Sequence, residues 1–174
     1  MKKILISFVV ALMALSASAQ VYVGGALSWT HDDDRSYNSF ELAPEVGYYF
    51  TPKWALGCEL AYAHDKQQAV KSNSFIIAPY ARYIFFNKGI VRLFVDGSLG
   101  FSTQKYKDVD DSDNGFEIGF KPGIAFEATK HICLEAHYGF LGYRDKFAGA
   151  GANASVSGLD FDPNSLRLSI KYEF

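Results

Sequence analysis

Histidines near serines are the residues in this sequence that could support nucleophilic chemistry. Such catalysis requires a hydroxyl within hydrogen-bond reach of a basic imidazole. His137 is the best placed of the four histidines, but on an extended strand the next residue on its face is Gly139. His31, His64 and His131 fall in expected loops or turns. We therefore predict no catalytic residues and no enzymatic activity.

An acidic stretch between Lys107 and Gly115 resembles a calcium loop and contains Asp108, Asp110, Asp111 and Asp113. The EF-hand pattern needs Gly at position six and Glu at position twelve. Starting at Asp110 gives Gly115 but then Lys121, and starting at Asp108 places Asp113 where the glycine belongs. The stretch is expected to be a solvated loop that binds divalent cations loosely, with no dedicated metal site and no cofactor.

The elements that must position any functional residue are best seen in the last nine residues. Large apolar residues alternate there with polar ones, so that Leu168 and Ile170 lie on one face and Arg167 and Lys171 on the other. Only an extended strand sorts residues with a period of two onto two faces. The apolar face then needs a protein layer or a lipid against it.

The same alternation recurs in seven earlier segments. We predict eight strands, at about residues 21–30, 40–50, 54–63, 75–86, 91–101, 116–126, 132–140 and 166–174. Short turns at 51–53, 87–89 and 129–131 alternate with longer polar segments at 31–38, 65–73, 104–114 and 145–163. This spacing is typical of an all-β, eight-stranded antiparallel up-and-down transmembrane β-barrel with external loops at one end.

The two strand faces differ in a way that favours lipid over a soluble core. The polar face consists mostly of Gly, Ala and Ser with isolated charges, which suits a crowded barrel interior. The other face is rich in Leu, Ile, Val and aromatic residues on every strand. Aromatic residues are expected to form two interfacial girdles. The first, near the short turns, is Tyr48, Phe50, Trp54, Tyr83, Phe85, Phe126, Tyr172 and Phe174; the second, near the long loops, is Trp29, Phe40, Tyr62, Phe75, Phe101, Phe116 and Phe140.

Six inward-facing charges fall at similar depth, three acids and three bases. Buried charges must be paired and hydrogen-bonded, so we predict a salt-bridge network in the lumen. Its members are Glu45, Glu59, Arg82, Asp96, Lys121 and Arg167, with His137 and Tyr80 adjoining. A row of titratable groups that passes protons or ions is the alternative.

The first 19 residues have the pattern of a secretory signal peptide. Lys2 and Lys3 precede an apolar run, and Ala17-Ser18-Ala19 provides small residues for cleavage between Ala19 and Gln20. The expected mature domain is 20–174. The formal charge is −2 for the whole chain and −4 for this domain, because the first 19 residues contain two lysines. That balance disfavours nucleic acid as a partner.

Two further predictions concern single residue types. Cys58 and Cys133 point to opposite faces of non-adjacent strands, so both are expected to be free thiols. Three prolines, Pro44, Pro79 and Pro122, face outward before the short turns, and each is expected to mark a bulge or bend.

With these residues in hand, the chain resembles the small porin-like outer-membrane β-barrel family of the OmpA/OmpX type. Residues 43–50 before a turn and 54–57 after it look like that family's second and third strands, and Tyr172-Glu173-Phe174 is similar to its carboxy-terminal assembly signal. The resemblance implies export to the outer membrane of a Gram-negative bacterium. It also implies contact with outer-membrane lipid, lipopolysaccharide and the barrel-assembly machinery.

The function that the resemblance implies is structural or interactive, through the four external loops, with the partner unidentified. A narrow porin-like passive channel is the alternative. A lipid A-modifying enzyme, an activity of some eight-stranded barrels, is a further alternative that the histidine positions disfavour.

Overall fold

The computed structural model describes residues 20–32, 37–67, 70–106, 112–148, 155–161 and 166–174. Almost all of them lie in ten β-strands. Their bounds are β1 Val21–Asp32, β2 Tyr37–Thr51, β3 Trp54–Gln67, β4 Val70–Lys88, β5 Val91–Tyr106, β6 Ser112–Glu127, β7 Ile132–His137, β8 Phe140–Asp145, β9 Val156–Asp160 and β10 Arg167–Glu173. Among the described residues, no helix has the length and apolar character needed to cross a membrane.

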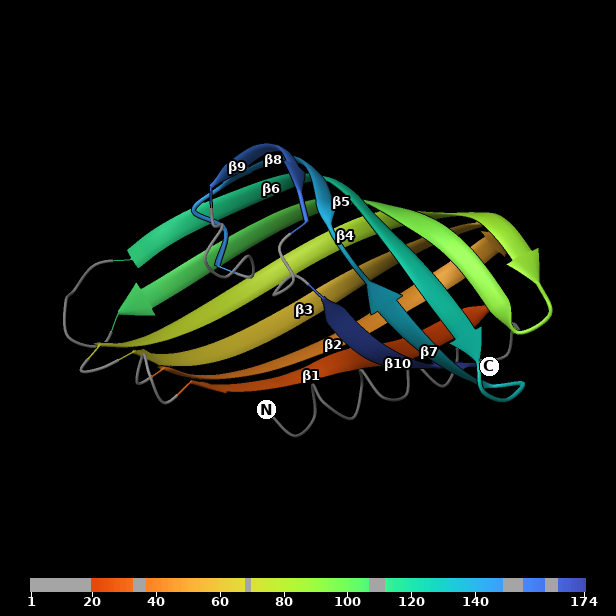
Figure 1. Cartoon of the computed structure of the whole chain (residues 1–174), viewed down its shortest axis with the longest axis horizontal. Coiled ribbons are helices and arrows are strands. Elements are labelled where there is room, and N and C mark those ends of the chain that lie inside the picture. Colours follow the sequence, from red (N-terminus) through yellow and green to blue (C-terminus); the bar gives the residue numbers. More distant parts are fainter. Residues whose placement is uncertain (1–19, 33–36, 68–69, 107–111, 149–154, 162–165) are drawn as a thin grey trace, which may run out of the picture.

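Antiparallel pairing closes these strands into a barrel. Strands β1 to β6 pair in chain order, β6 pairs with β7, β7 with β10, and β10 with β1. The hairpin of β8 and β9 continues the wall beside the outer part of β6. β7 and β8 therefore form one interrupted strand of the wall, and β9 and β10 form another. Counted in this way the barrel has eight strands, and the predicted eight-stranded antiparallel barrel is confirmed (Figure 1).

The interruption between β7 and β8 is a one-residue register shift. On β6, Gly123 pairs with His137, whereas three residues earlier Phe120 pairs with Leu141 instead of Phe140. Gly139 adopts a φ of 86°, which a residue with a side chain rarely reaches. A shift of one residue reverses the faces of a strand. Phe140 therefore points inward and is only 2% exposed, so its predicted place in the outer aromatic girdle is wrong.

Several strands extend farther than the alternation indicated. The expected 65–73 and 104–114 loops are shortened by the ends of β3 to β6, and the 31–38 loop by β1 and β2. The segment 145–163 contains β9, which pairs with β8. The predicted single loop there is wrong, because a short strand of Val, Ser, Gly, Leu and Asp has little alternation to reveal it. Residues 33–36, 68–69, 107–111, 149–154 and 162–163 of these four segments lie outside the described residues.

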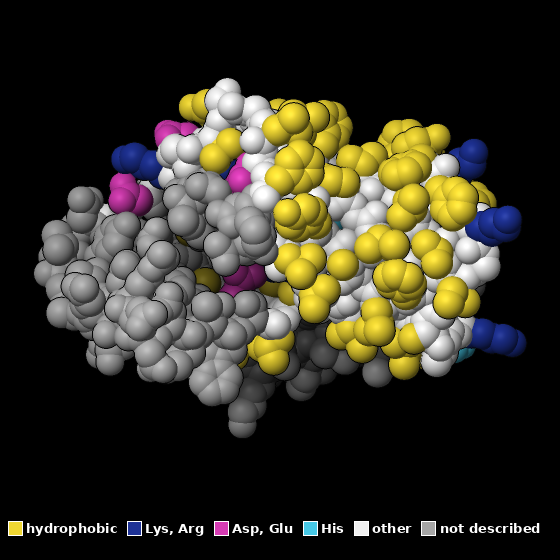
Figure 2. Space-filling model, in the orientation of Figure 1, with side chains coloured by type: hydrophobic (Ala, Val, Ile, Leu, Met, Phe, Trp, Pro, Cys, Tyr) yellow, Lys and Arg dark blue, Asp and Glu magenta, His cyan; other side chains and the backbone are white. Residues whose placement is uncertain are grey.

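The outward face of the barrel is apolar and the inward face is polar or small. On β10, Leu168 is 64% exposed and Ile170 54%, whereas Lys171, the residue after Ile170, is 1% exposed. Figure 2 shows hydrophobic side chains spread over the wall of the barrel, with basic side chains projecting at one end. This is the end of the three short turns, where Lys53, Lys88 and Lys130 are exposed.

The aromatic residues near the short turns mostly face outward, as expected for a girdle at a membrane interface. Phe50, Trp54, Phe85, Phe126 and Tyr172 are all between 42% and 56% exposed. At the other end Phe40, Tyr62, Phe75 and Phe101 are similarly exposed. The side chain of Trp29 lies outside the described residues.

The prolines behave differently from one another. The pairing of β2 with β3 omits Pro44, and that of β4 with β5 omits Pro79, but the register is the same on both sides of each. The expected bulges at these two positions are wrong, since the missing N–H removes a ladder bond without adding a residue. Pro122 does lie at the register shift, where its carbonyl oxygen accepts a hydrogen bond from the Tyr138 amide at 3.2 Å.

Both cysteines are free, as predicted. Cys133 on β7 is buried in the lumen, whereas Cys58 on β3 is half-buried on the outward face.

Candidate functional site

The lumen holds many buried charged side chains, among them Arg82, Asp96 and Glu135. We call the four residues Arg82, Asp96, Glu135 and His137 the central cluster; β4, β5 and β7 position them. Arg82 donates from Nε and Nη2 to the two oxygens of Asp96, both at 2.7 Å, and from Nη1 to Glu135 Oε1 at 2.6 Å. The Nε2 atom of His137 lies 2.9 Å from Asp96 Oδ2. Since Arg82 is 1% exposed, this guanidinium is fully removed from solvent and paired by two carboxylates.

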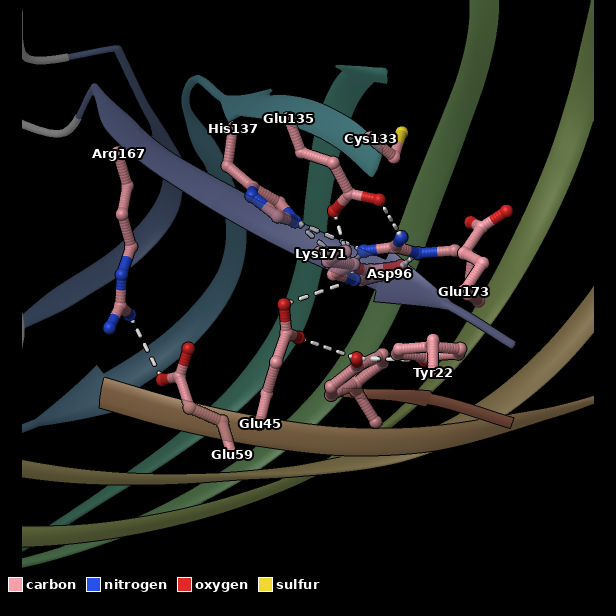
Figure 3. Close-up of polar contacts among 12 residues, drawn as sticks. Tyr22, Glu45, Glu59, Asp96, Cys133, Glu135, His137, Arg167, Lys171 and Glu173 are labelled. Carbon is pink, nitrogen blue, oxygen red and sulfur yellow. Dashed lines mark hydrogen bonds and ion pairs between the residues drawn. The ribbon is translucent and has the colours of Figure 1, made fainter. Parts of the chain in front are cut away.

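Lys171 extends the central cluster toward β1 and β2. Its Nζ atom lies 2.9 Å from Glu135 Oε2 and 3.2 Å from Glu45 Oε1. The hydroxyl of Tyr80 donates to Glu45 Oε2 at 2.7 Å, and it lies 2.8 Å from the hydroxyl of Tyr22. Figure 3 shows these side chains converging from opposite walls of the barrel.

Arg167 belongs to a separate group. It donates to Glu41 at 2.7 Å and to Glu59 at 2.9 Å, and it stands apart from the central cluster in Figure 3. The side chains of this group are 19% to 31% exposed. Solvent therefore weakens this attraction more than it weakens the pairs around Arg82.

A third group lies in the outer half of the lumen. Lys121 is 2.6 Å from Glu117, and Arg144 lies 3.4 Å from Glu117 and 3.6 Å from Asp160. The guanidinium of Arg144 stands over the ring of Phe140, 3.7 Å from its centroid. The register shift at Gly139 brings both of these residues inward.

A fourth group occupies the lumen near the short turns. Arg92 lies 3.1 Å from Glu127 and donates to Glu173 at 2.9 Å and to the Cys133 sulfur at 3.4 Å. The Tyr49 hydroxyl also donates to Glu173, at 3.1 Å. The four groups together line the barrel interior from the short turns to the outer half.

The predicted network residues are distributed over three of these groups. Glu45, Arg82, Asp96 and His137 meet in or beside the central cluster, Glu59 and Arg167 form a pair elsewhere, and Lys121 bonds Glu117. Sequence reasoning missed Glu135 and Lys171 as partners of Arg82 and Glu45. The alternation of the sequence places both side chains on the inward face. Their depth in the barrel depends on the tilt of the strands, which the sequence of a single strand does not reveal.

The remaining predicted site residues lie at the membrane-facing and terminal parts of the chain. Tyr172 and Phe174 face outward with their ring centroids 5.0 Å apart, and their role as an assembly signal stays a prediction. Ala19 lies outside the described residues, so cleavage before Gln20 also stays a prediction.

The arrangement of the side chains in the lumen favours ion pairing over catalysis. His137 contacts Asp96, Arg82 and the ring of Phe94, each of which positions the imidazole without supplying a nucleophile. In the described ranges, no group of three or more His, Cys, Asp or Glu residues has an arrangement suited to a metal ion. Much of the acidic 104–114 segment, residues 107–111, lies outside those ranges.

Comparison with known proteins identifies the family to which this barrel belongs. The family model described as the outer membrane protein beta-barrel domain matches residues 4–174. The chain belongs to this outer-membrane β-barrel family. A comparison with curated proteins gave no match.

Two solved structures illustrate the fold of the family. Neisserial surface protein A has a TM-score of 0.54 and 16% identity, covering 90% of this chain and 98% of its own. The Yersinia pestis attachment invasion locus protein Ail has a TM-score of 0.50 and 16% identity, with 89% of this chain and 97% of its own covered. At this identity the likeness concerns the fold alone, and the family places the barrel in the outer membrane.

Proposed function

We propose that this outer-membrane barrel is a non-conducting anchor that presents its external segments for surface interactions and reinforces the envelope. The observation that carries the proposal is the filled lumen. Arg82, Glu135 and Lys171 reach across it from three strands and are each no more than 3% exposed. In an eight-stranded barrel, side chains that meet in this way leave no wide aqueous path.

The arrangement of the connections supports an interactive role. The three turns at one end, 52–53, 89–90 and 128–131, are short. The connections at the other end, 33–36, 68–69, 107–111, 146–155 and 161–166, together hold more of the chain that lies outside the strands. The two solved structures of similar fold are named as a surface protein and an attachment invasion locus protein. Such names favour external contacts over transport.

Conductance across a planar bilayer tests the sealed lumen. We expect the refolded wild-type barrel to give no steady ion-sized channels at neutral pH. Steady channels in the wild type, abolished when Gly100 or Gly119 is replaced by a larger residue that fills the lumen, would instead support the narrow passive channel.

Pull-down with the refolded barrel tests the interactive role. In a control barrel, only parts of these segments that lie between the strands, residues 33–36, 68–69, 107–111 and 149–154, are replaced by Gly and Asn, so that the strands of the wall are kept. We expect proteins or glycans from the cell surface to be retained by the wild type and lost with the control. Equal retention by both would show that the wall and not the external segments makes the contact.

An enzymatic role is tested separately by mass spectrometry of lipid A from cells with and without the protein. Because His137 is held by Asp96 inside the lumen, away from the acyl chains of the bilayer, we expect the acylation pattern to be unchanged.

A further inference from the structure

The barrel is closed by a short ladder between its first and last strands. Four residues of β1, Tyr22 to Gly25, pair with β10, whereas the pairing of β1 with β2 continues to Asp32. From Ala26 to Asp32, β1 pairs with β2, and in the described part of the chain its pairing with β10 has ended. We call this junction of β1 and β10 the seam.

An apolar groove of about 480 Å³ straddles the seam on the outward side of the barrel. Its floor is the stretch Gly24 to Ala26, where the outward position is a glycine, Gly25, and the side chain of Ala26 is buried on the lumen side. Its walls are Leu27, Leu42, Pro44, Leu134, Leu168 and Ile170. Leu27 is 68% exposed and Leu168 64%, so this surface has no cover from the described part of the chain.

The depth of the groove assigns it to one leaflet. β1 begins at Val21 near the short-turn rim, and Leu27 lies six residues farther along. At about 3.3 Å per residue and a tilt of about 40°, Leu27 is roughly 15 Å above that rim, close to the middle of an apolar band about 25 Å tall. Leu134 is two residues into β7 and lies near the rim itself. Because the short turns of outer-membrane barrels lie on the periplasmic side, the groove extends from the periplasmic interface to about the bilayer midplane.

We propose that this groove binds one acyl chain of a phospholipid from the periplasmic leaflet, and that the chain covers the seam. This goes beyond the proposed function, which assigns no lipid site. The groove is continuous with the exposed apolar residues of β1, β2, β7 and β10, so hydrocarbon is the material already in contact with it. Lys130, exposed in the turn just before β7, places a positive charge at headgroup depth, where a phosphate lies.

The test compares lipid retention by a filled groove and by a matched outward position. Leu27→Trp places a large ring in the groove, whereas Leu56→Trp adds the same ring on β3, where Leu56 is 56% exposed and outside the groove. Each barrel is refolded, shown to be folded by its heat-modifiable gel mobility, and titrated in detergent with palmitoyl lysophosphatidylethanolamine. Native mass spectrometry then measures the 1:1 complex. Leu168→Trp replaces Leu27→Trp if that variant does not fold.

We expect the wild type and Leu56→Trp to bind the single-chain lipid alike, and the filled variant to bind at least tenfold more weakly, since the chain loses its apolar contacts. An octanoyl analogue with the same headgroup should also bind at least tenfold more weakly than the palmitoyl lipid. Equal binding by the filled variant, or equal binding of the two chain lengths, overturns the proposal. If the wild type and Leu56→Trp form a barrel dimer and the filled variant does not, the proposal is also overturned, because the groove would then be an interface between copies.

Discussion

Replacement of Arg82 by Met tests whether the central cluster holds the barrel together. The variant keeps the approximate length of the side chain and its apolar contact with Phe94, over whose ring the guanidinium now lies at 3.7 Å. It removes two hydrogen bonds to Asp96 and one to Glu135. Asp96 retains His137 at 2.9 Å and Glu135 retains Lys171 at 2.9 Å, so neither carboxylate is left alone.

The expected cost follows from these contacts. Three bonds to charged groups at about 1.5–3 kcal/mol each would give an upper bound of roughly 5–9 kcal/mol. Because both acids keep one partner, we expect a loss of about 3–5 kcal/mol, as for other broken buried ion pairs. Adding Asp96→Asn to the variant removes the carboxylate that has lost both of its bonds from the guanidinium, and it should recover part of this loss with a coupling of about 1–3 kcal/mol.

Reversible urea unfolding of the barrel in phospholipid vesicles measures these free energies. Lys105→Met is the matched control, because Lys105 is an exposed cation on the outer part of β5 and its removal should change stability by less than about 0.5 kcal/mol. A loss below about 1 kcal/mol for Arg82→Met, or full additivity with Asp96→Asn, would refute the reasoning. The charges in the lumen would then be solvated and independent of one another.

Three further predictions follow from the faces and turns of the barrel. Leu168→Arg places a charge against hydrocarbon and should cost about 2–4 kcal/mol in the vesicle unfolding assay, whereas Ala128→Arg in an exposed turn should be nearly neutral; equal costs would contradict the lipid-facing orientation of β10. Gly89→Val should cost about 1–2 kcal/mol in the same assay, since Gly89 has a φ of 63° and open space around it, and Gly89→Asn should cost less; no difference between the two would exclude backbone strain as the cause. A lipid-soluble maleimide should modify Cys58 and leave Cys133 intact in the folded barrel, as measured by peptide mass spectrometry; modification of both at equal rates would contradict the burial of Cys133.

The sequence predicts those parts of the barrel that depend on strand periodicity. The outward position of Leu168 and the inward position of Lys171 follow from a period of two, because one face of each strand must meet hydrocarbon. The inward positions of Asp96 and Arg82 follow for the same reason. These features need no knowledge of how strands are placed relative to one another.

Features that depend on register and backbone geometry could not be read in this way. The φ of 86° at Gly139 shifts the register and turns Phe140 inward, and a glycine in a strand is compatible with either outcome. The contact of Lys171 with Glu135 and Glu45 depends on barrel tilt and stagger, which are properties of the closed sheet. Arg144 was missed because the expected strand ended at residue 140, whereas β8 continues to Asp145.

Spin-label accessibility along β10 tests the central claim most directly. Single nitroxides at Leu168, Ser169 and Ile170, in a barrel without its two native cysteines and inserted in phospholipid vesicles, would each report collisions with dissolved oxygen. Since oxygen concentrates in hydrocarbon, we expect high accessibility at Leu168 and Ile170 and low accessibility at Ser169. The reverse alternation, or equal accessibility at all three, would contradict a barrel whose apolar faces meet the bilayer and whose charges meet one another inside.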